Sequence, residues 1–159
     1  MYRRTYLRTA GLLGLTTLAG CVAAGAGESS SVKTAEPMLP VEPDYGDWFE
    51  NVSNYDGTTD RRGESEVLVH VGTKANMGSF GFGPVAAAVS PGTTVVWEWT
   101  GKGGSHNVVS EDDAFDSGPL AAAAGHRYTH RFDDVGTYRY VCEPHRAMGM
   151  RGAVVVVED

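Results

Sequence analysis

Short segments of alternating apolar and polar residues, separated by glycine and acidic turns, limit the fold of this chain more than any other feature. In the segment 93–100, TTVVWEWT, the side chains of Val95, Trp97 and Trp99 share one face. Comparable segments are expected as strands at 66–71, 80–89, 105–109, 127–132, 136–142 and 150–157. About seven short strands in roughly 110 residues predict an all-β fold, a β-sandwich with Greek-key connections.

The valine run at 154–157 differs from the other segments because it has no polar face. A continuous apolar run of this length is typical of a strand that is covered on both sides or inserted between two sheets. Trp97 and Trp99 are expected in the core rather than stacked on a cofactor. The sequence therefore predicts a buried C-terminal strand and an aromatic core.

Residues 1–20 have the layout of an export signal. Three arginines precede an apolar run at 10–19 that is too short to cross a membrane as a helix. The first two arginines are adjacent, as in a twin-arginine signal, and the residues LAGC that end at Cys21 resemble a lipobox. We expect the signal to be removed and Cys21 to carry a lipid anchor at the outer face of the cell membrane.

Residues 21–43 are expected to form a flexible tether, because they are small, polar and proline-containing and show no apolar period. The folded domain is expected at 44–159. The chain has two cysteines, and lipidation of Cys21 leaves Cys142 without a partner for a disulfide. A free cysteine outside the cell needs another explanation, either as a buried inert thiol or as a ligand.

The charge of the chain argues against nucleic acid as a partner. The formal net charge at pH 7 is -7, and loss of the arginines in the signal makes the remainder more acidic still. Binding to nucleic-acid phosphates requires an excess of lysine and arginine. The acidic surface instead fits a monomer that its carboxylates keep soluble.

The stretch CEPHRAMGM at 142–150 brings together a thiol, an imidazole and two thioethers, all of which bind soft metals. One thiolate and two imidazoles with a weak axial thioether form the blue-copper arrangement. The stretch has one histidine, so a second must come from elsewhere. His106 follows two glycines that let the backbone pack closely, which makes it the candidate. Spacing alone leaves Met148 and Met150 both open as the thioether.

Several motifs together resemble the cupredoxins of the plastocyanin type, and within them the halocyanins. The motifs are SHNVV at 105–109, AFDSG at 114–118 and YRYVCEPHRAMGMRG at 138–152. The resemblance extends from about residue 44 to the end and implies a cupredoxin-type sandwich with one type 1 copper ion. It implies four ligands, with the family's spacing of four residues after the second histidine selecting Met150: His106, Cys142, His145 and Met150.

The same resemblance implies an electron carrier rather than an enzyme, with copper alternating between Cu(II) and Cu(I) and membrane-associated redox proteins as partners. Asn107 resembles the asparagine that ties the two ligand loops together, with its backbone N–H donating to the thiolate. Plastocyanins have an aromatic residue where this chain has Val141, which puts their side route for electrons in doubt. The exposed edge of His145, with Met148 beside it, is therefore the expected docking patch.

Two other functions stay open as alternatives. A copper-binding or storage module would use the same ligands without passing electrons on. A thiol enzyme would pair Cys142 with His145 or His106, but the sequence offers no clear oxyanion site and no third orienting group. His126 and His130 have a zinc-like spacing, yet they lie in a strand-like segment and no glutamate follows His126.

Overall fold

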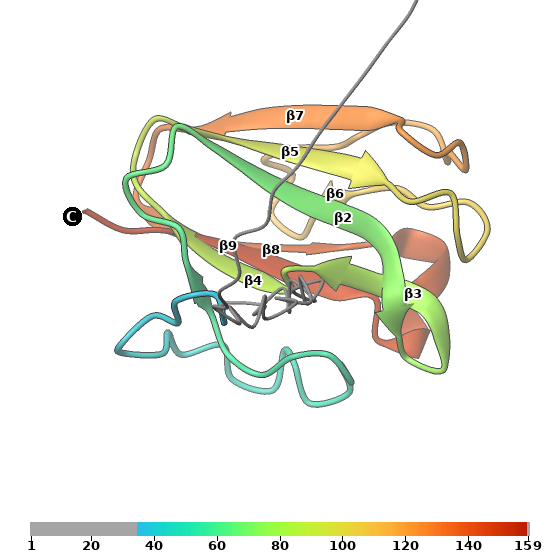
Figure 1. The fold of residues 1–159 in the computed structure, drawn as a ribbon, viewed down its shortest axis with the longest axis horizontal. Helices are drawn as coiled ribbons and strands as arrows, with labels where there is room; N and C mark the ends of the chain where they lie inside the picture. The colour runs from blue at the N-terminus through green and yellow to red at the C-terminus, as the bar shows by residue number, and fades with distance from the viewer. Residues whose placement is uncertain (1–34, 159) are drawn as a thin grey trace, which may run out of the picture. The chain divides into compact units, whose positions relative to one another are not determined.

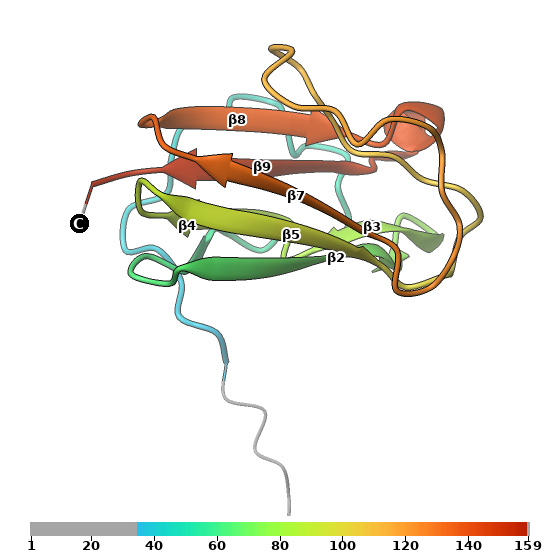
Figure 2. The same ribbon diagram turned by 90° about the horizontal axis from the view of Figure 1, so that it is seen from above.

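Two β-sheets form the domain, which confirms the predicted all-β sandwich (Figures 1 and 2). The computed structural model describes residues 35–158, so the expected signal and lipidation site lie outside the described residues. The elements are β1 Thr59–Asp60, β2 Glu66–Ala75, β3 Gly78–Gly83, β4 Ala86–Val89, β5 Thr93–Trp99, β6 Val109–Ser110, β7 Arg127–Phe132, β8 Gly136–Val141, the 3-10 helix η1 Glu143–Met148 and β9 Arg151–Val156. One sheet has the order β1-β4-β9-β8-β6, and the other has the order β3-β2-β5-β7. No helix within residues 35–158 is long and apolar enough to cross a membrane.

Two of the expected strands differ from the prediction. The segment 80–89 is divided at Pro84, because proline has no N–H to donate to a β-ladder. β3 therefore pairs with β2 in one sheet, and β4 pairs with β9 in the other. Within the segment 105–109, only Val109 lies in a strand, as the first residue of β6, and His106 forms an isolated bridge with Ala121.

Aromatic side chains fill the space between the sheets. Trp97 and Trp99 are 0% and 2% exposed, as the alternation in their segment predicted. The Trp97 ring, from β5, lies 5.4 Å from the ring of Tyr140 on β8 and 5.3 Å from that of Phe115. Rings from both sheets thus meet in one core beneath the end of the sandwich where β5 and β8 finish.

β9 is buried on both of its faces, which confirms the prediction from the valine run. Val154 and Val156 belong to the core between the sheets, and Val155 belongs to a second apolar cluster with Trp48. The indole N–H of Trp48 also donates a hydrogen bond to the carbonyl of Gly152 at 3.1 Å. Trp48 lies in residues 44–58, which we call the N-terminal segment. This segment covers the outer face of the sheet that contains β9.

Backbone hydrogen bonds join the chain to the domain before residue 44, where the domain was expected to begin. The backbone N–H of Leu39 donates to the carbonyl of Thr58 at 2.8 Å, and that of Asp60 donates to the carbonyl of Pro37 at 2.7 Å. Met38 forms a bridge with Thr59. The C-terminal part of the expected tether is therefore paired with strand β1.

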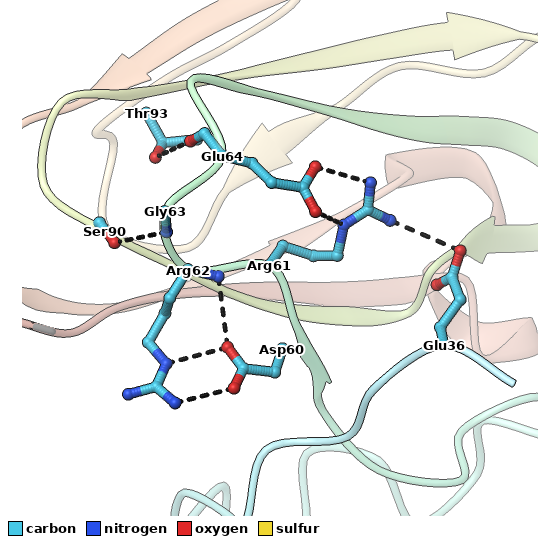
Figure 3. A network of polar contacts seen from close by, with 8 residues as sticks. All are labelled: Glu36, Asp60, Arg61, Arg62, Gly63, Glu64, Ser90 and Thr93. Carbon is cyan, nitrogen blue, oxygen red and sulfur yellow. Dashed lines mark hydrogen bonds and ion pairs between the residues drawn. The ribbon is translucent and has the colours of Figure 1, made fainter.

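An ion-pair network around Arg61 reaches the first described residues (Figure 3). The guanidinium of Arg61 binds both oxygens of Glu64, at 2.7 and 2.9 Å, and reaches Glu36 at 3.5 Å. The backbone N–H of Arg61 donates to the carbonyl of Ala88 on β4. Because β4 runs parallel to β9 and Val89 pairs with Val156, this network lies at the end of the strands where β9 finishes.

Candidate metal centre

Three of the four predicted ligands lie together at the other end of the strands. The Nδ1 atoms of His106 and His145 are 3.1 Å apart. The Sγ atom of Cys142 is 3.3 Å from Nδ1 of His145 and 3.6 Å from Nδ1 of His106. Cys142 and His106 are buried, and His145 is half-buried. The three donors face a single point that one small metal ion can occupy.

The ring of His106 is oriented by its surroundings. Its Nε2 atom lies 2.7 Å from the carbonyl oxygen of Lys102, so Nε2 carries the hydrogen and Nδ1 keeps its lone pair free for a metal. The backbone of His106 exchanges two hydrogen bonds of 2.9 Å with Ala121, and its carbonyl accepts the indole N–H of Trp99 at 3.2 Å. Such outer contacts fix both the tautomer and the direction of a ligand.

Two glycines make room for this histidine. A Cβ on Gly72 would lie 2.6 Å from the Lys102 carbonyl and 3.2 Å from Nε2 of His106. A Cβ on Gly103, which has a φ of +80°, would collide with the carbonyl of Ser79. Close packing was expected at the glycines before His106, whereas the role of Gly72 was not predicted.

The second ligand loop runs from Cys142, at the end of β8, through η1. The helix begins with Pro144 in its first turn, where a fixed φ suits a helix start. The backbone N–H of His145 donates to the carbonyl of Cys142 at 3.1 Å, which brings both side chains to the same side of the loop. Gly149 ends the helix with a φ of +93°, a left-handed conformation that glycine adopts readily. The ring of Phe80 packs 4.7 Å from that of His145.

The surroundings of Cys142 and His145 favour uncharged side chains before any metal binds. Burial raises the pKa of the Cys142 thiol, and hydrogen bonds from the backbone N–H groups of Asn107 and His145 act in the opposite direction. Burial, followed by the proximity of His106, lowers the pKa of His145. A neutral imidazole is the form that binds metals, and a thiol with a raised pKa needs a metal to lose its proton.

Asn107 joins the two ligand loops, as predicted. Its Oδ1 atom accepts the backbone N–H of Glu143 at 2.9 Å, and its Nδ2 donates to the Glu143 carboxylate at 2.6 Å. The residues beside His106 and beside Cys142 are therefore tied directly to each other.

The two methionines of the loop lie in different environments. Met150 is fully buried in the core cluster that also contains Cys142. Its carbonyl accepts the backbone N–H of Cys142 at 3.1 Å, and its N–H donates to the carbonyl of His145 at 3.2 Å. The side chain of Met148 is 42% exposed. The fold thus places Met150 in the interior next to Cys142 and Met148 at the surface.

The remaining histidines do not join this group. The ring of His126 packs edge-on against Trp99 at 4.7 Å, and His130 packs against Phe115 at 5.0 Å and against Phe132 at 4.8 Å. Phe80 and Asn76, which contact the second ligand loop, were not predicted from the sequence. Neither had a signal in the sequence, because their contacts join residues far apart in the chain.

Known proteins are similar to this chain over most of the domain, including the part that contains the candidate metal centre. The family of copper binding proteins, plastocyanin/azurin family, matches residues 69–157. A halocyanin from Natronomonas pharaonis is 43% identical over 161 residues, which cover 97% of this chain and 96% of the relative. A plastocyanin from Scenedesmus fuscus is 36% identical, covering 57% of this chain and 99% of its own. Among solved structures, a purple cupredoxin from Nitrosopumilus maritimus is 28% identical with a TM-score of 0.48, covering 57% of this chain and 99% of its own.

Proposed function

Because this chain belongs to the plastocyanin/azurin family of copper-binding proteins, we propose that it carries single electrons on one type 1 copper ion. The observation that supports this most strongly is the convergence of two imidazole Nδ1 atoms and one thiol on a single point. Zinc sites usually use cysteine, histidine and carboxylate ligands, whereas two histidines, a cysteine and a nearby methionine suit copper.

We propose that His106, Cys142 and His145 would hold the ion, with the thioether of Met150 as the fourth and weaker ligand. When bound, copper supplies a centre that alternates between Cu(II) and Cu(I). The protein contributes a rigid cage: the Lys102 carbonyl orients His106, and burial keeps water away from the thiolate. A cage that barely changes between oxidation states keeps the cost of reorganisation small, which favours rapid electron transfer.

Electrons would enter and leave through the edge of His145. This ring is the half-buried member of the ligand group, and the exposed side chain of Met148 belongs to the same loop. Position 141 is a buried valine, so it offers no exposed aromatic side chain as a second route. We propose that this edge is the docking patch for membrane-associated redox proteins, and that the protein works as a monomer anchored by lipidated Cys21 at the outer face of the membrane.

The alternatives fit the geometry less well. A thiol nucleophile needs a thiolate that substrate can reach, but Cys142 is fully buried and burial raises its pKa. A storage module would have no need of a ligand cage with so many outer hydrogen bonds. Labelling with iodoacetamide tests the thiol-enzyme alternative, because a catalytic thiolate would react in the metal-loaded protein.

A visible spectrum of the copper-loaded protein tests the proposed function. We expect an intense absorption in the red part of the spectrum, because charge passes from the Cys142 thiolate to Cu(II), and we expect it to bleach with ascorbate and return with ferricyanide. The zinc-loaded protein is the colourless control. A protein that binds copper but stays colourless after oxidation with ferricyanide would contradict type 1 coordination, and a coloured protein that cannot be cycled would favour storage.

The axial assignment is tested by replacing each methionine with leucine. We expect Met150→Leu to raise the reduction potential, because loss of a donor destabilises Cu(II) more than Cu(I). The expected size is on the order of 60 mV, which corresponds to about a tenfold change in relative affinity. Met148→Leu is the matched control and should leave the potential unchanged. Equal shifts in both variants would count against Met150.

A further inference from the structure

The N-terminal segment touches the second ligand loop, although it lies outside residues 69–157, the part that matches the family. The Trp48 indole donates to the carbonyl of Gly152, and the guanidinium of Arg151 donates to the carbonyl of Trp48 at 3.2 Å. A Cβ on Gly149 would collide with the carbonyl of Asn51. The C-terminal half of the loop, on both sides of Met150, therefore rests on this segment.

Asn76 connects the same parts of the molecule through its side chain. Its Oδ1 atom accepts the backbone N–H of Ser53 at 2.9 Å. Its Nδ2 group donates to the carbonyls of Phe80 at 2.8 Å and of Gly149 at 2.9 Å. The backbone N–H of Asn76 donates to the hydroxyl of Ser53 at 2.7 Å. Asn76 is 7% exposed, so this one amide links the N-terminal segment, strand β3 and the ligand loop from the interior.

Two of these hydrogen bonds, to the carbonyls of Gly149 and Phe80, involve residues beside the metal centre. The carbonyl of Gly149 belongs to the peptide bond that precedes Met150, so holding this carbonyl limits the position of the Met150 side chain. The carbonyl of Phe80 belongs to the residue whose ring packs against His145. We infer that Asn76 is a positioning residue that fixes the axial side of the copper site by clamping the ligand loop to the N-terminal segment. This inference rests on the copper function proposed above.

Asn76 could instead be present only for its backbone. It has a φ of 54° and Met77 has a φ of 64°, both left-handed, in the turn between β2 and β3. Asparagine and glycine are the residues that such a hairpin turn favours. Asn76→Gly separates the two explanations, because glycine keeps the turn and removes the amide. Met77→Gly is the matched control, since Met77 occupies the same turn with a fully exposed side chain.

If Asn76 clamps the loop, the copper-loaded Asn76→Gly variant should differ from the wild type in the relative intensities of its visible bands and in its reduction potential. Its Cu(I) affinity, measured by competition with a chelator, should fall about tenfold, as for other residues that support metal ligands. Met77→Gly should match the wild type in all three measurements. A wild-type spectrum, potential and affinity in Asn76→Gly would overturn the inference.

A second variant and a metal-free measurement complete the test. Asn76→Asp keeps the acceptor for Ser53 but loses both N–H donors. Its new carboxylate would shift the potential by charge alone, so this variant is assessed by hydrogen exchange. In the apo-protein, the backbone N–H of Met150 should exchange faster in the variants than in the wild type, while the N–H groups of β5 should not. Unchanged exchange at Met150 would contradict the clamp. Failure of the wild type to turn blue with copper would contradict only the proposed function.

Discussion

The Cys142→Ser variant is expected to lose the red absorption of the copper-loaded protein completely. The absorption arises from the thiolate, and a serine hydroxyl is a harder and far less acidic ligand that cannot replace it. Copper affinity should fall by at least about a hundredfold, since even residues that only support a ligand contribute about tenfold to a hundredfold. Visible spectroscopy and competition with a chelator measure both effects.

Cys21→Ser is the control for this experiment, because Cys21 is the only other cysteine of the chain. This variant should keep the full absorption of the wild type. The unfolding of apo Cys142→Ser should resemble that of the wild-type apo-protein, since serine is close to cysteine in size. If Cys142→Ser stayed blue, or if Cys21→Ser lost its colour, the assignment of the thiolate ligand would be wrong.

Trp97→Ala is expected to lower the free energy of unfolding by about 3–5 kcal/mol. The Trp97 side chain is completely buried and packs against rings from both sheets, so its removal leaves a large cavity between them. A domain of this size has a total stability of roughly 5–15 kcal/mol, so the loss is a large part of the whole.

Denaturant unfolding of the apo-protein, followed by far-UV circular dichroism, measures this loss. Leu120→Ala serves as the control, because the Leu120 side chain is 52% exposed and its truncation should change stability by less than about 0.5 kcal/mol. A loss below about 1 kcal/mol in Trp97→Ala would mean that the sheets close over the cavity and that the aromatic core is less rigid than the packing indicates.

The strands were predictable where a local pattern carried the information. Alternation placed Trp97 and Trp99 in the core, and the valine run indicated a strand covered on both sides. The division at Pro84 was missed, although proline is a local signal that interrupts a β-ladder. The isolated bridge of His106 was not predicted, because it depends on which distant segment lies alongside. The residue pattern of one segment does not show which other segment it pairs with.

The residues of the metal centre were also predictable only in part. Cys142 and His145 lie within one short stretch, and the glycines before His106 made it the candidate for the second histidine. The family resemblance was needed to choose Met150 over Met148. Asn76 and Phe80 could not be found in this way. Asn76 reads as an ordinary turn residue, and its role depends on hydrogen bonds to Ser53 and Gly149, which lie far from it in the sequence.

The pairing of Pro37 and Leu39 with strand β1 has a consequence for how the domain responds to force. These backbone hydrogen bonds, with the Arg61–Glu36 ion pair beside them, hold the first described residues at the end of the strands opposite the metal centre. A lipid anchor upstream would therefore pull on the domain at one end, while a redox partner would press on the His145 edge at the other. The mechanical load and the electronic contact would be separated by the full length of the β-strands.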